Sequence, residues 1–105
     1  MTIEDVKSLL ICVDPDVQRY DHDRAGKGDA YTVWREVGPV GLYADGREAG
    51  SLRFQVDRFT KEEDDETAAE LLRALGERDD ITVDYLVDYE RDTGYIHHIY
   101  DCEGL

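Results

Sequence analysis

The sequence predicts an α+β fold in a single domain over residues 1–105, with helices packed on one face of a mostly antiparallel four-stranded sheet. A chain of 105 residues is the size of one domain with one hydrophobic core. Its 41% hydrophobic and 10% aromatic content is typical of globular proteins rather than disordered ones. The spacing of its apolar residues gives the element order α-β-β-α-β-β.

The first expected element is an amphipathic helix over residues 2–13. Thr2 is placed to cap its N-terminus, and Asp5 follows three residues later, as in a capping box. Pro15 ends the helix, because the residue before a proline avoids helical backbone angles. The apolar stripe of this helix consists of Ile3, Val6, Leu9, Leu10 and Val13.

Two strands and two loops are expected next. Residues 14–29 are rich in aspartate and should form a flexible acidic loop, with a short extended piece at 17–20. Residues 31–37 are β-branched and aromatic, and residues 51–59 alternate apolar and polar side chains, so both segments are expected to be strands. Between them, residues 38–50 hold four glycines and a proline and are expected to form a long hairpin loop.

A second helix is expected after an acidic entry at 61–65, with Gly76 as its C-terminal cap. Residues 81–90 then show the clearest alternation in the chain, in which Leu86 is the exception, an apolar residue on the polar side. A turn leads into a closing strand at 95–102. The expected core collects the apolar faces of these elements: Ile3, Val6, Leu9, Leu10, Leu52, Phe54, Val56, Leu71, Leu72, Leu75, Val83 and Val87.

The charge balance excludes several classes of protein. The chain holds 26 acidic and 12 basic residues, which gives a net charge of −14. Such a surface repels phosphate, so we expect no specific binding to nucleic acid and no binding to anionic membranes. No apolar run approaches the roughly 20 residues of a membrane span. The acidic first segment is also unlike a signal peptide.

Two patterns suggest metal binding, and both fail. Residues 21–32 match a calcium-binding loop at several positions, but Ala25 and Thr32 stand where that loop needs oxygen ligands, and a strand follows instead of a helix. His98 and Cys102 share a strand face but are separated by about 13 Å, which is too far for two ligands of one ion. We therefore expect no metal and no cofactor, and we interpret the calcium-like segment as a solvated acidic loop.

The cysteines and tyrosines are open to less specific interpretations. Cys12 and Cys102 are expected to be buried free thiols in a reducing environment rather than a disulfide. The seven tyrosines suit both sheet packing and a subunit interface, and the sequence leaves the two interpretations open. No nucleophile motif or glycine-rich phosphate loop is present, and the acidic run at 62–66 suits a solvated helix entry, so we do not expect an enzyme.

Five segments of the chain carry a recognisable pattern: VQRY at 17–20, YTVW at 31–34, YADG at 43–46, FQVDRFTK at 54–61 and YERDTGYIHHIYDCE at 89–103. In this order, after a short opening helix, they resemble the tail completion, or tail terminator, proteins of long-tailed bacteriophages and prophages. The resemblance covers most of the chain and is strongest over residues 30–103. Its motifs belong to structural strands, so it brings no catalytic residues.

This resemblance implies a structural virion protein at the tail–head junction, present in the host cytoplasm during assembly. Members of the family form a ring, typically a hexamer, on the finished tail tube, where the ring stops elongation and receives the head. The implied partners are further copies of the chain, the tail tube protein and the head–tail connector protein, and the isolated protein can be a monomer. Residue type and loop position give the expected contact residues, which are Trp34, Arg35, Tyr43, Arg47 and Tyr95.

The acidity fits this role, because an acidic ring lumen would let DNA pass without binding it. The same acidity suits a second hypothesis, a DNA mimic that inhibits a basic host protein. A neighbouring head–tail neck protein and a cytoplasmic interaction domain without a phage role are further alternatives. Ring formation, as opposed to tight binding to a basic partner, separates the first two hypotheses.

Overall fold

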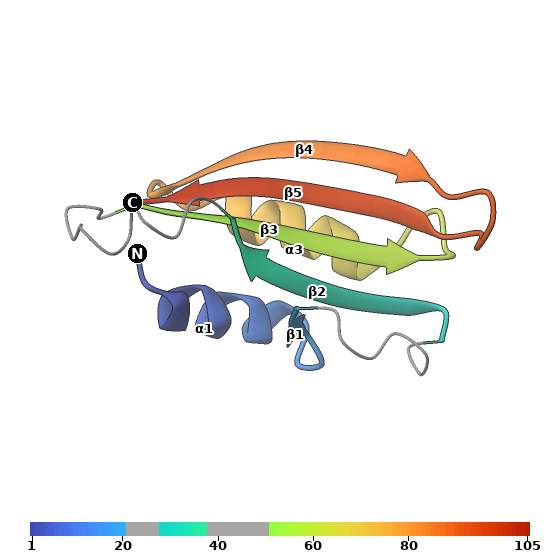
Figure 1. Cartoon of the computed structure of the whole chain (residues 1–105), viewed down its shortest axis with the longest axis horizontal. Coiled ribbons are helices and arrows are strands. Elements are labelled where there is room, and N and C mark those ends of the chain that lie inside the picture. The colour runs from blue at the N-terminus through green and yellow to red at the C-terminus, as the bar shows by residue number, and fades with distance from the viewer. Residues whose placement is uncertain (21–27, 38–50) are drawn as a thin grey trace.

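The computed structural model describes residues 1–20, 28–37 and 51–105, and Figure 1 shows a sheet with helices against it. The chain is α+β, as the sequence predicts. Its helices are α1 (Ile3–Val13) and α3 (Glu66–Gly76). Its strands are β1 (Gln18–Arg19), β2 (Ala30–Glu36), β3 (Leu52–Thr60), β4 (Ile81–Tyr89) and β5 (Ile96–Gly104). The expected flexible loop at 14–29 lies partly, and the hairpin loop at 38–50 wholly, outside the described residues.

The sheet has five strands in the order β1-β2-β3-β5-β4, and it is mixed. The expected mostly antiparallel sheet of four strands is corrected by a fifth strand, β1, which pairs parallel with β2. The remaining neighbours pair antiparallel, with β3 and β5 in the centre and β4 at the edge. The extended piece expected at 17–20 therefore exists, but it joins the sheet. Two residues are too few for a periodic pattern to reveal a strand.

Local sequence signals set the ends of α1. The Thr2 hydroxyl accepts from the Asp5 N–H at 3.1 Å, and the Asp5 carboxylate accepts from the Thr2 N–H at 2.9 Å. This reciprocal pair is the expected capping box. At the other end, the Asp14 N–H donates to the Leu10 carbonyl before the chain turns at Pro15. Among the described residues, neither helix has the length and apolar character needed to cross a membrane.

The core lies between the two helices and one face of the sheet. Of the residues expected there, seven are buried: Val6, Leu10, Leu52, Phe54, Val56, Leu71 and Leu75. Ile3, Leu9, Leu72 and Val83 pack around them half-buried. Trp34 and Tyr100 also belong to this core, and Trp34 meets Phe54 edge to face at 6.2 Å. Val87, which the pattern placed in the core, is 48% exposed.

A buried ion cluster ties β3 to both helices. Arg58 donates to both carboxylate oxygens of Asp65 at 2.8 and 3.1 Å, to Thr32 at 3.1 Å, and to Asp14 at 3.5 Å. Asp65 also caps α3 by accepting from the Ala68 N–H. Burial raises the pKa of Asp65, but the hydrogen bonds from Arg58 and Ala68 outweigh it and hold that pKa below its ordinary value.

The two cysteines occupy different environments. Cys102 is buried, and burial raises the pKa of its thiol to about 12. Cys12 is exposed on α1, which corrects the expectation that both thiols are buried. It falls beside the apolar stripe of that helix rather than on it, because α1 turns its buried face through Val6 and Leu10. Both cysteines are free, and no disulfide joins them.

The Arg58 cluster makes a prediction for stability. We expect Arg58→Met to lower the free energy of unfolding by about 3 kcal/mol, because it leaves the Asp65 carboxylate buried without its partner. Arg53→Met is the matched control, since Arg53 lies on the same strand but is exposed, and it should change stability by less than about 0.5 kcal/mol. Urea denaturation followed by circular dichroism measures both. Equal effects in the two variants would show that the cluster contributes nothing specific.

Candidate protein interface

The outer edge of β4 carries backbone groups that point away from the sheet. The Glu90 N–H donates to the Tyr95 carbonyl, and the Leu105 N–H donates to the Asp80 carbonyl. Both pairs continue the β4–β5 register, so the even-numbered residues make the hydrogen-bonded pairs with β5. Because such pairs alternate in an antiparallel ladder, the odd-numbered residues direct their N–H and C=O groups outward. Val83, Tyr85 and Val87 therefore present donors and acceptors at the open edge.

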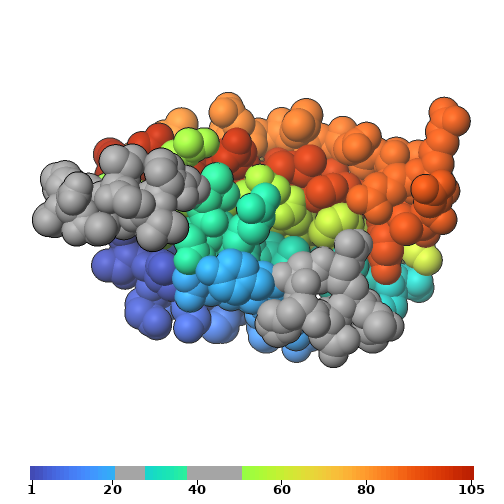
Figure 2. Space-filling model, viewed as in Figure 1, coloured from blue at the N-terminus to red at the C-terminus, as the bar shows by residue number. Residues whose placement is uncertain are grey.

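Large apolar side chains surround this edge on both faces of the strand. Tyr85 is 40%, Leu86 59%, Val87 48% and Tyr89 59% exposed. We call these four residues the β4 surface. Figure 2 shows β4, in orange, running along the upper rim of the molecule. Single exposed apolar residues are ordinary, but a run of four along one edge strand is typical of an interaction site.

The exposure of Val87 and Tyr89 follows from the lengths of two elements, whereas Leu86 is exposed because it lies on the face opposite the helices. The 11 residues of α3 span about 16 Å, whereas the 9 residues of β4 span about 30 Å. Ile81 and Val83, at the start of β4, pack into the core under the helix. The first turn of α3 lies level with Tyr85, since both line the same depression. Val87 and Tyr89 lie beyond the end of the helix, so α3 does not cover their side chains.

Acidic side chains border the β4 surface. Asp84 and Asp88 lie on the strand itself, on the face opposite the helices, and both are exposed. On the helix face, a depression of about 360 Å³ is lined by the acidic segment 63–66, by Leu72, and by Tyr85 and His98. The edge therefore combines apolar contact area with negative charge on both sides.

Tyr85 is held in place by two neighbours on β5. Its hydroxyl lies 2.7 Å from Nδ1 of His98, and its ring stacks on Tyr100 with 5.1 Å between centroids. Tyr100 is itself fixed, because its hydroxyl donates to the Ala68 carbonyl at 2.7 Å. Burial raises the pKa of Tyr85, so its hydroxyl stays protonated as a hydrogen-bonding group. Within the β4 surface, Tyr85 is thus held by contacts with β5, and Tyr89 is the more exposed of the two tyrosines.

The opposite face of the sheet holds a second polar cluster, around His97. Its Nε2 lies 2.8 Å from Asp57, its Nδ1 lies 3.7 Å from Glu90, and its ring stacks on Phe59 at 4.1 Å. Gln55 donates to both oxygens of the same Asp57 carboxylate. These contacts join β5 to β3 and to the β4–β5 turn, and we interpret the cluster as a structural contact between strands.

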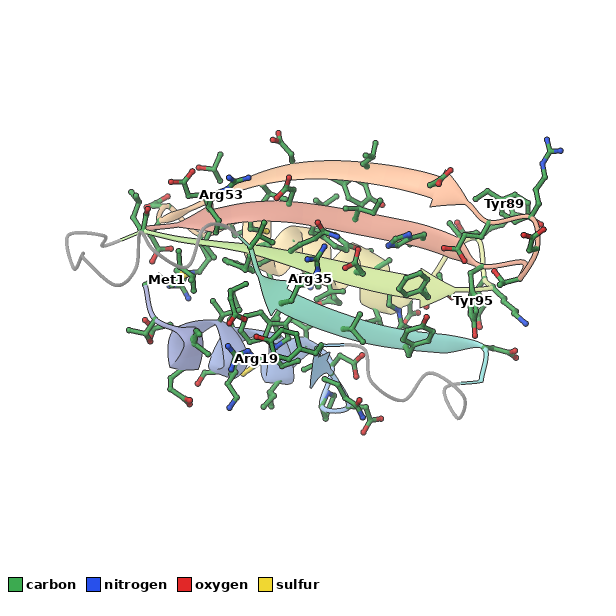
Figure 3. All side chains as sticks on the ribbon, viewed as in Figure 1. Met1, Arg19, Arg35, Arg53, Tyr89 and Tyr95 are labelled. Carbon is green, nitrogen blue, oxygen red and sulfur yellow. The ribbon has the colours of Figure 1, made fainter. Side chains whose placement is uncertain are left out.

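The structure separates the contact residues that the sequence predicted. Trp34 is 2% exposed and contributes to the core, with the Arg19 guanidinium 5.5 Å above its ring. Arg35 is exposed on the face opposite α3, as Figure 3 shows. Tyr95 is half-buried, because it packs with Tyr31 and Phe59 and donates to the Gly28 carbonyl at 2.5 Å. Tyr43 and Arg47 lie outside the described residues. The predicted residues therefore do not form one surface.

The structure describes only some of the residues in the two metal-like patterns. Residues 21–27 of the calcium-like segment lie outside the described residues. His98 and Cys102 share the helix face of β5, but Cys102 is 2% exposed in the core and His98 bonds to Tyr85. In the described parts of the chain, no three acidic, histidine or cysteine side chains are grouped as metal ligands are.

Sequence reasoning missed the β4 surface, although one signal pointed to it. Leu86 interrupts the alternation as an apolar residue on the polar side of its strand. Such an exception indicates either an error in register or an apolar contact outside the chain's own core. Comparison of the sequence with models of protein families and with curated proteins finds no match.

Replacing one residue of the β4 surface should leave the fold intact. We expect Leu86→Ser to change the free energy of unfolding by less than about 0.5 kcal/mol, because the side chain is already in solvent. The matched control is Leu71→Ser, which removes a fully buried leucine and should cost about 3 kcal/mol or more. Urea denaturation decides the comparison, and a large loss in Leu86→Ser would mean that this leucine packs within the chain.

His98 should titrate abnormally. Burial lowers its pKa, as do Arg58 and His97, while Asp65 acts in the opposite direction. We expect the ring to titrate below 6.5, measured by NMR. Because the folded-state pKa is depressed, its contribution to stability is present above pH 6.5 and is lost as the pH falls toward the folded value. The variant His98→Gln should lose this part of the pH dependence. A His98 pKa at or above 6.5 would contradict the burial of the ring.

Proposed function

We propose that this chain is a structural assembly protein that caps the tail tube of a long-tailed phage or prophage and joins the tail to the head connector. The observation that carries the proposal is the β4 surface, an uncovered edge strand with four exposed apolar side chains. Surfaces of this kind bind other proteins through main-chain hydrogen bonds and apolar contact. The pattern of strand segments that resembles tail completion proteins supports the particular role.

Capping requires a subunit that attaches to the last tube ring and leaves no site for the next one. An edge strand suits this task, because once its open edge is paired no further strand can add there. A ring of copies, typically a hexamer, would close by head-to-tail contacts repeated around the tube axis. The other side of the ring would then receive the connector.

The charge of the chain supports a passage for DNA through such a ring. With a net charge of −14 per copy, a ring lumen would repel phosphate rather than bind it. The same charge makes copies repel each other, so assembly should be weaker at low salt, where charges are less screened. A DNA-mimic inhibitor shares the acidity but does not need exposed leucine, valine and tyrosine on one strand.

The test is native mass by light scattering, from low to moderate salt, with and without purified tail tubes. We expect a ring of copies at moderate salt, or one complement of protein on each tube end, and tubes that no longer elongate. Leu86→Ser should weaken the attachment without unfolding the protein. A chain that stays monomeric and ignores tubes at every salt concentration would overturn the proposal, and capture of a basic nuclease would favour the DNA-mimic hypothesis.

A further inference from the structure

We propose that the open edge of β4 binds an extended strand from a different protein, one in which basic side chains alternate with apolar ones. The inference rests on the proposed function, since it names the chemistry of the partner that the docking protein would recognise. Backbone geometry gives the mode of pairing, and the two rows of side chains on β4 give the composition of the partner.

The middle of β4 offers outward backbone N–H and C=O groups to a partner strand. Val83, Tyr85 and Val87 point their N–H and C=O groups outward, as the register with β5 requires. The Tyr89 N–H is occupied, because it donates to the Asp88 carboxylate at 2.9 Å. The available stretch therefore ends just before Tyr89, and it offers three consecutive outward residues to a strand added at this edge.

The row of side chains facing away from the helices selects for positive charge. This row contains Asp84, Leu86 and Asp88, with Thr82 before it and Glu90 after it. Side chains directly opposite on neighbouring strands lie about 5 Å apart, so each carboxylate would meet one partner side chain. Lysine or arginine satisfies these positions and can lay its aliphatic stem on Leu86 between the charges.

The other row selects for apolar contact. Tyr85, Val87 and Tyr89 lie on the helix face, and Tyr85 is braced by Tyr100 beneath it. A partner strand that places its basic residues opposite Asp84 and Asp88 necessarily places its alternate residues beside this apolar row. The complementary segment is therefore basic on one face and apolar on the other.

A second copy of this chain is a poor occupant of the same edge. Antiparallel pairing of two β4 strands centred on Leu86 would set Asp84 of one copy against Asp88 of the other, and like charges directly opposite destabilise a strand pair. Pairing centred on Tyr85 would set Asp84 against Leu86, so this register also gives the carboxylates no positive partner. Acidic residues on an edge strand thus discourage self-pairing while they leave the edge open to a cationic strand. None of the described strands combines a basic row with an apolar row, which directs the proposal to a different protein.

The test uses the full chain and three labelled peptides at moderate salt. The probe is Lys-Val-Lys-Val-Lys-Val-Lys, and the charge control is Glu-Val-Glu-Val-Glu-Val-Glu, which has the same apolar row. A third peptide, with proline in place of the central valine of the probe, cannot complete the pairing. We expect fluorescence anisotropy to show binding of the lysine peptide at least about tenfold tighter than either control. NMR shifts should be confined to β4 and its neighbours.

Two sets of variants locate the binding. Val87→Pro removes an outward N–H that β5 does not use, and should abolish binding, whereas Val87→Thr keeps that N–H and should bind. The double variant Asp84→Lys with Asp88→Lys keeps the backbone and should reverse the preference toward the glutamate peptide. This gain of binding does not depend on whether the proline variant folds.

Equal affinity for the lysine and glutamate peptides, or shifts on other strands, would overturn the inference. Dimerisation of the chain through β4 without any peptide would do the same and would make a second copy the occupant. These outcomes leave the proposed function to its own test, because rings or capped tube ends can be observed whether or not β4 prefers a cationic strand. Failure of tube capping with intact peptide binding would overturn only the phage role.

Discussion

The structure depends on a mismatch in length between the sheet and the helix that covers it. Strands of 9 residues span about 30 Å, while the 11 residues of α3 span about 16 Å. One helix therefore cannot cover the sheet from end to end. Below the helices, apolar residues of four strands form the core. At the end of the sheet that α3 does not cover, other interactions must stabilise the strands. These interactions differ between the central strands and the edge strand β4.

At the centre of the sheet, the far ends of the strands are stabilised on both faces. On the face opposite the helices, Tyr31 and Phe59 stack at 4.7 Å and Tyr95 meets both edge to face. On the helix face, Arg58 ties β3 to Asp14 and Asp65. β4 has a neighbour on one side only, so its far half stays exposed, and that half carries four large apolar side chains. The short helix therefore leaves Val87 and Tyr89 exposed on the helix face, and they form part of the surface to which we assign docking.

Local signals predicted most elements, and tertiary relations decided what they missed. The Thr2–Asp5 cap and the alternation of β3 are encoded within a few residues, so the sequence is sufficient for them. β1 exists only through parallel pairing with β2, which no local pattern carries. Alternation correctly predicted that Val87 lies on the apolar row of β4. It carries no information about the length of α3, which does not extend over Val87. Trp34 was selected by residue type, which does not distinguish a core indole from one at an interface.

The central claim is that the open edge of β4 is the docking surface, and hydrogen–deuterium exchange on the protein alone and on tail tubes tests it most directly. The amides of Val83, Tyr85 and Val87 point away from β5, so they should exchange rapidly in the free protein. We expect strong protection of these three amides on the tube, with the even-numbered amides of β4 protected in both states. Protection on other elements, with the three outward amides still exchanging freely, would contradict the claim.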